Sequence, residues 1–143
     1  MTDKRDAYLR RNYDIDVNDE ARILQKQDYK CAVCGRDFFD KDNNQICRYE
    51  IDHKHLKFDA HRLGIGWSAF AVGSPNNYVA KTKAAAIKLA QRGELRGSVR
   101  GILCGGRYAG CNRKLGRLDK PEWLQAAHDY IADPPAKYVL TRA

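Results

Sequence analysis

The chain has 143 residues, of which 31% are charged, and its formal net charge is +8. This length suits one domain with a real hydrophobic core, and no apolar run approaches the length of a membrane span. The charged N-terminus lacks the apolar stretch of a signal peptide. We therefore expect a cytosolic protein without a membrane partner.

The positive charge is concentrated in one segment. Residues 81–120 contain eleven Lys and Arg against two acids, a net charge of +9, so the rest of the chain is close to neutral. A solvated charged face is the alternative explanation. A concentration of one sign beside candidate metal ligands favours a nucleic acid partner.

The first predicted element in chain order is a helix. Residues 1–17 are polar, and we expect them to be loosely attached. Asn18 is a candidate N-cap for a helix over 18–30 that has two acids in its first turn. This helix leads into the C-x-x-C-G sequence of 31–35, which is typical of a metal-binding knuckle because glycine lets backbone amides turn toward a thiolate.

A short strand is predicted over 49–53, and residues 56–96 then form a long middle section. Within this section the alanine-rich stretch 81–92 predicts a helix that Gly93 ends. A second strand is predicted over 98–104.

A short helix is expected up to Gly116. Another should follow, with Asp119 as its N-cap and Glu122 completing a capping box. It has an apolar stripe that includes Trp123 and Ile131, and Pro134-Pro135 ends it.

The five cysteines indicate a metal site, because disulfides rarely persist in the cytosol. Cys31 and Cys34 form a C-x-x-C pair, and six residues, three of them glycine, separate Cys104 from Cys111. Four thiolates suit a structural Zn²⁺ ion. Cys47 is the substitute if the second pair fails, and small buried residues are the alternative explanation for that pair.

A second constellation comprises Asp52, His53 and His55 together with Asn112. Carboxylate and amide oxygens suit Mg²⁺ or Mn²⁺, and a neutral imidazole beside such an ion can deprotonate water. Neighbours in an ideal strand point to opposite faces, so the strand must end or bulge at Asp52 and His53 if both are to reach one phosphate.

Taken together, these motifs resemble the phage recombination endonuclease VII family, a branch of the His-Me finger (HNH) nucleases. The matching stretches are Cys31-Ala32-Val33-Cys34-Gly35, Ile51-Asp52-His53-Lys54-His55, Val99-Arg100-Gly101-Ile102-Leu103-Cys104 and Cys111-Asn112-Arg113-Lys114-Leu115-Gly116. They span residues 31–116 in the order of the family.

The resemblance implies an α+β fold, with a ββα-metal core braced by a four-cysteine zinc site, flanking helices and an insertion between the two core strands. It implies that His53 is the general base, that Asp52 and Asn112 hold the catalytic cation, and that His55 lies close to the scissile phosphate. We expect one nuclease domain over 1–143, divided into a helix (18–30), first knuckle and catalytic strand (31–55), insertion (56–96), second strand, second knuckle and metal helix (97–118), and C-terminal helix and tail (119–143).

Three features depart from the family pattern. The second cysteine pair is usually C-x-x-C, and the segment between the catalytic strand and the second strand, here 43 residues, is usually short. Prototypes also carry an acid about one helical turn beyond the metal-binding Asn, where this chain has Leu115, and Glu50 is the alternative acid. Only 27 residues follow Gly116, which leaves little room for the long dimerisation helices of the prototype resolvase.

The predicted function is metal-dependent hydrolysis of DNA, with branched DNA (a Holliday-junction-resolvase-like activity) as one substrate class and a homodimer as one assembly. The alternatives are a nonspecific, nicking or packaging-associated HNH nuclease and a zinc module that binds DNA without cutting it. If the protein is phage-encoded, its location is the host cytoplasm. The residues expected to contact DNA are Arg100, Arg113, Lys114, Lys81, Lys88 and Arg92.

Overall fold

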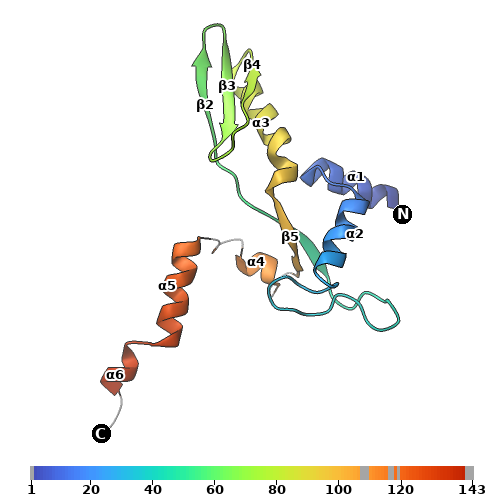
Figure 1. Ribbon diagram of the computed structural model, residues 1–143, viewed down its shortest axis with the longest axis vertical. Helices are drawn as coiled ribbons and strands as arrows, with labels where there is room; N and C mark the ends of the chain where they lie inside the picture. Colours follow the sequence, from blue (N-terminus) through green and yellow to red (C-terminus); the bar gives the residue numbers. More distant parts are fainter. Residues whose placement is uncertain (1, 107–109, 116–117, 119, 141–143) are drawn as a thin grey trace.

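A computed structural model describes residues 2–106, 110–115, 118 and 120–140 of the chain (Figure 1). It has a mixed α+β architecture, as expected, with one two-stranded and one three-stranded antiparallel sheet. Among the described residues, no helix is long and apolar enough to cross a membrane.

The N-terminal segment is helical and packed, so the expectation of a loose attachment is wrong. Helix α1 (Thr2–Tyr13) places Leu9 in the core with no exposed surface. Arg5 also pairs with Glu20 of the next helix, and the Asp6 carboxylate accepts a hydrogen bond from the Val17 amide at 3.0 Å. One buried leucine and these polar contacts fix a helix whose sequence is otherwise polar.

Helix α2 (Val17–Lys26) begins and ends earlier than predicted. Its N-cap is Asp16 rather than Asn18, because Asp16 and Asp19 form a reciprocal capping box with N–H···O distances of 2.8 and 3.0 Å. It ends before Asp28 and Tyr29, whose φ angles of 56° and 57° lie in the left-handed region.

The central sheet pairs β1 (Tyr49–His53) with β5 (Val99–Cys104) in antiparallel register, with Ile51 opposite Ile102. The register shifts between Asp52 and His53, where a strand end or a bulge was expected if both side chains are to reach one phosphate. The core around this sheet consists of Leu9, Ile15, Leu24, Cys31, Phe38, Ile51, Ile102, Leu103 and Cys104.

The middle section forms a small sheet and a helix with a core of their own. Strands β2 (Phe58–Leu63), β3 (Gly66–Ala71) and β4 (Tyr78–Ala80) pair in that order, and α3 (Lys83–Ser98) packs against them (Figure 1). The buried centre of this lobe is Ala69, Ala86 and Ala90.

Helix α3 continues past Gly93, which was predicted to end it. The reason is packing: a Cβ at Gly93 would lie 2.3 Å from the ring of Tyr78, so glycine lets the helix approach β4. The helix runs directly into β5, and this lobe is therefore joined to the second strand of the central sheet without a loop.

The C-terminal part comprises α4 (Cys111–Leu115), α5 (Pro121–Ala132) and α6 (Ala136–Leu140), which was not predicted. The N-cap of α5 is Lys120, with no side-chain hydrogen bond, instead of Asp119, which lies outside the described residues. The apolar stripe of α5 is largely exposed, with 51% of Trp123 and 76% of Ile131 accessible to solvent.

Candidate metal centre and catalytic site

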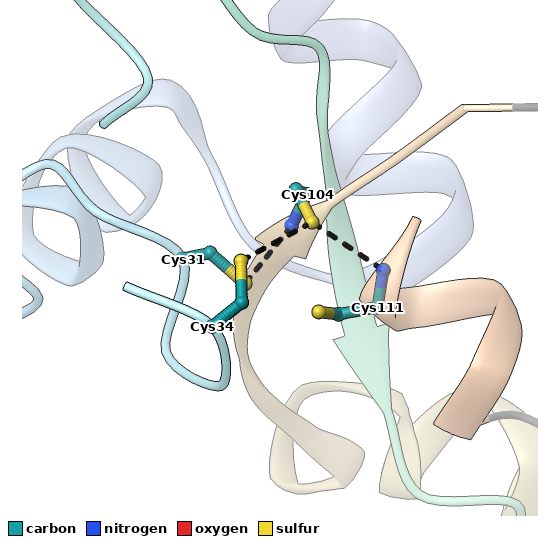
Figure 2. Close-up of side chains that lie close together, drawn as sticks. All are labelled: Cys31, Cys34, Cys104 and Cys111. Carbon is teal, nitrogen blue, oxygen red and sulfur yellow. Dashed lines mark hydrogen bonds between the residues drawn. The ribbon is translucent and has the colours of Figure 1, made fainter. Parts of the chain in front are cut away.

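Four cysteines from two distant parts of the chain meet at one end of the central sheet (Figure 2). Cys31 and Cys34 come from the loop after α2, Cys104 ends β5, and Cys111 begins α4. Their Sγ atoms all lie within 4.8 Å of one another. The Sγ atoms of Cys34 and Cys104 are 3.7 Å apart, and a tetrahedral zinc with Zn–S bonds of about 2.3 Å places its sulfurs about 3.8 Å apart. The cluster is therefore suited to zinc.

The long spacing of the second pair is accommodated by glycine. A Cβ at Gly110 would lie 2.6 Å from the Cys104 carbonyl oxygen and 2.7 Å from the backbone of Gly105. Glycine thus lets the chain fold back until Cys111 reaches the sulfurs. Cys47 is not one of the clustered cysteines; its sulfur donates to the Arg48 carbonyl at 3.4 Å.

Backbone amides point at the sulfurs. The Cys104 amide donates to Cys31 Sγ at 3.3 Å, and the Cys111 amide donates to Cys104 Sγ at 3.4 Å. Burial raises the pKa of Cys31, but amide N–H groups aimed at its sulfur outweigh burial and lower that pKa to about 6. Burial and then the neighbouring sulfurs raise the pKa of Cys111 to about 12. The four sulfurs repel one another as anions, and a divalent cation between them removes that repulsion.

Asp52 lies near the end of β1 and is bound by an arginine. Its side chain is 9% exposed, and both carboxylate oxygens accept hydrogen bonds from Arg100, from Nε at 2.9 Å and from Nη2 at 3.0 Å. Arg100, which was expected to contact DNA, thus contacts the expected cation ligand.

Asn112 begins the helix that follows the cluster, one residue after Cys111. Its Nδ2 donates to Glu50 Oε2 at 2.9 Å. The structure thus brings Asn112 against Glu50, whereas the sequence prediction paired it with Asp52. The sequence did contain a signal for Glu50: side chains two residues apart in a strand lie on the same face, so Glu50 and Asp52 share one face of β1.

His53 is half-buried at the bulge of β1, and its ring centroid lies 5.6 Å from that of Tyr13 and 5.1 Å from that of His55. Burial, followed by the charge of His55, lowers the pKa of His53 below 6.5. The lowered pKa favours the neutral imidazole, which is the form that a general base needs. Both histidines line a cavity of about 250 Å³ with Gln91 and Leu95 of α3, so the middle lobe forms one wall of the histidine cleft.

The remaining predicted cations differ in their surroundings. Lys81, Lys88, Arg113 and Lys114 are exposed. Arg92 instead contacts the first helix region, with Nη1 3.1 Å from the Arg11 carbonyl oxygen and Nη2 3.5 Å from Asp14. Two arginines that the sequence prediction missed, Arg5 and Arg48, line the cavity that contains Glu50 and Asn112.

Comparison with known proteins identifies a family. The family model of recombination endonuclease VII matches residues 6–133. No curated protein and no solved structure matches the chain. The family match covers most of the chain and includes both cysteine pairs, β1, β5 and α4. The chain therefore belongs to the recombination endonuclease VII family, a family of DNA endonucleases that act in recombination.

Proposed function

We propose that the protein is a zinc-braced, divalent-metal-dependent DNA endonuclease of the His-Me finger type, with His53 as its general base. The observation that carries this proposal is the position of His53, which lies next to Asp52 at the register shift of β1 and lines a cavity together with His55. Membership in a nuclease family supports the reaction class. A zinc ion held by the four clustered cysteines fixes β5 and the start of α4, and with them Asn112.

The proposed reaction is hydrolysis of a phosphodiester bond, in which water attacks phosphorus on the side opposite the leaving 3′ oxygen. His53 accepts a proton from water as the water attacks phosphorus, and His55 lies close to the scissile phosphate. Asp52 and Asn112 supply hard oxygen ligands for magnesium or manganese. The bound cation supplies positive charge that stabilises the developing negative charge on the phosphate.

DNA contacts are assigned to basic side chains around this centre. Arg113 and Lys114 project from α4, and Lys81 and Lys88 belong to the middle lobe that walls the histidine cleft. Their contacts to backbone phosphates orient the duplex without reading its sequence. Arg100 donates hydrogen bonds to Asp52 in the described structure, and 35% of its side chain is exposed.

The substrate class is decided by one experiment. Purified protein is incubated with a supercoiled plasmid and with a four-way DNA junction, each with magnesium, manganese or EDTA. Cleavage by zinc-loaded protein that requires added magnesium or manganese supports the endonuclease, and preference for the junction identifies a resolvase. Equal cutting of both substrates identifies a nonspecific or nicking nuclease. Binding without cleavage in any metal identifies a non-catalytic zinc DNA-binding module.

A further inference from the structure

Glu50 has the position and accessibility of a cation ligand. It lies on β1 two residues before Asp52, and 35% of its side chain is exposed, against 9% for Asp52. A Cβ at Gly105 would lie 2.6 Å from the Glu50 side chain, so glycine leaves room for the carboxylate at the end of β5. Of the two acids on this strand, Glu50 is the more accessible to solvent, and its Oε1 lies 3.7 Å from Nε of the exposed Arg48.

The distance between Glu50 and Asn112 matches two ligands of one ion. Glu50 Oε2 and Asn112 Nδ2 are 2.9 Å apart. Adjacent ligands of an octahedral magnesium, with bonds of about 2.1 Å, are about 3.0 Å apart. The two ends of an amide have nearly the same shape, and a half-turn places the Asn112 oxygen where its nitrogen lies. The pair then presents two hard oxygens at the spacing of an octahedral site.

The surroundings of this pair suit a phosphodiester. Glu50 and Asn112 line a polar cavity of about 490 Å³ together with Arg48 and Tyr13. Tyr13 lies between this cavity and the proposed base, because its ring centroid is 5.6 Å from that of His53. A second cavity of about 520 Å³ is lined by Glu50, Arg48 and Arg113. An arginine guanidinium can bind two oxygens of one phosphate at the same time.

We propose that Glu50 is a ligand of the catalytic cation, which it binds together with Asn112. This inference rests on the proposed function, because it names a ligand for the cation of that reaction. Asp52, whose two oxygens accept hydrogen bonds from Arg100, is the less accessible acid of the strand.

The test measures cation binding directly. Free Mn²⁺ is quantified by electron paramagnetic resonance in titrations of zinc-loaded protein, without DNA, for the wild type, Glu50→Gln, Asp52→Asn and Asp129→Asn. Gln at position 50 keeps an oxygen that accepts the Asn112 hydrogen bond and loses only the charge. Asp129, exposed on α5, is a control with the same charge change. Zinc content and melting temperature show that each variant is folded.

We expect one Mn²⁺ per wild-type chain, roughly tenfold or weaker binding for Glu50→Gln, and unchanged binding for Asp129→Asn. Unchanged Mn²⁺ affinity in Glu50→Gln, with a loss in Asp52→Asn, overturns the role of Glu50 and leaves the proposed nuclease intact. A loss in Glu50→Gln with none in Asp52→Asn supports Glu50 and removes Asp52 from the site. Absence of Mn²⁺ binding by the wild-type protein overturns both the ligand and the metal-dependent reaction.

Discussion

Replacing one clustered cysteine, Cys111→Ser, should unfold the central sheet region and abolish zinc binding. Cys111 joins α4 to a cluster whose other half, Cys31 and Cys34, lies more than 70 residues earlier in the chain. A structural zinc contributes roughly 10 kcal/mol or more to folding. The total stability of an ordinary domain is only about 5–15 kcal/mol, so loss of the ion removes an amount comparable to the whole.

The matched control is Cys47→Ser, because Cys47 is the one cysteine outside the cluster. Elemental analysis should find close to one zinc per chain in the wild type and in this control, and far-UV circular dichroism should show the same melting temperature. Cys111→Ser, or wild type treated with EDTA, should lose zinc and most of its cooperative unfolding transition. Retention of zinc and an unchanged transition in Cys111→Ser would refute the assignment of the fourth ligand, and a fully folded wild type without zinc would refute the site.

Three further predictions address packing, pH and charge. Leu9→Ala should lower the free energy of unfolding by about 2–5 kcal/mol in a urea titration, since Leu9 is fully buried; no change would mean that α1 is detached. Hydrogen bonds from Arg96 hold the pKa of Asp19 well below its ordinary 3.8. The stabilisation of the folded state by the Asp19 carboxylate is therefore complete above about pH 4 and is lost only as the pH falls further. Asp19→Asn should therefore lower the melting temperature equally at pH 6 and pH 8. A smaller effect at pH 6 would contradict a lowered pKa of Asp19. DNA affinity should fall steeply with salt, and reversing Lys81 and Lys88 to Glu should reduce the log–log slope by about 2; a flat wild-type dependence would mean a solvated surface.

The sequence predicted the central elements well because their signals are local and chemically specific. The knuckle of Cys31 and Cys34, the strands at 49–53 and 98–104, and the helix after Cys111 follow from cysteine spacing and short apolar runs. The bulge at His53 followed from the requirement that neighbouring side chains serve one site.

The errors arose where distant contacts override local signals. The first helix is held by one leucine and by polar contacts to α2, which its own polar sequence does not reveal. Gly93 lies inside a helix because Tyr78, from a strand, covers it. The N-cap error is of another kind, because its signal was local: Asp16 has an acid three residues later, Asp19, that completes the capping box, whereas Asn18 has Ala21 there.

The candidate site shows the same limit. The sequence placed Asp52, His53 and Asn112 in one centre, but the partner of each carboxylate depends on side chains that converge from β1, β5 and α4. Arg100 binds Asp52, and Asn112 binds Glu50, through contacts 48 and 62 residues apart in the chain. No local pattern specifies contacts of that kind.

The measurement that tests the central claim most directly is the cleavage rate of His53→Ala on a DNA substrate. Removal of the general base should reduce the rate on the order of 10²–10⁴-fold, while DNA binding persists because other residues contact the phosphates. Added magnesium or manganese should not restore this variant, whereas Asp52→Ala and Asn112→Ala should recover in part if they hold the cation, with His55→Ala intermediate. Cleavage by His53→Ala at the wild-type rate would contradict the His-Me finger assignment.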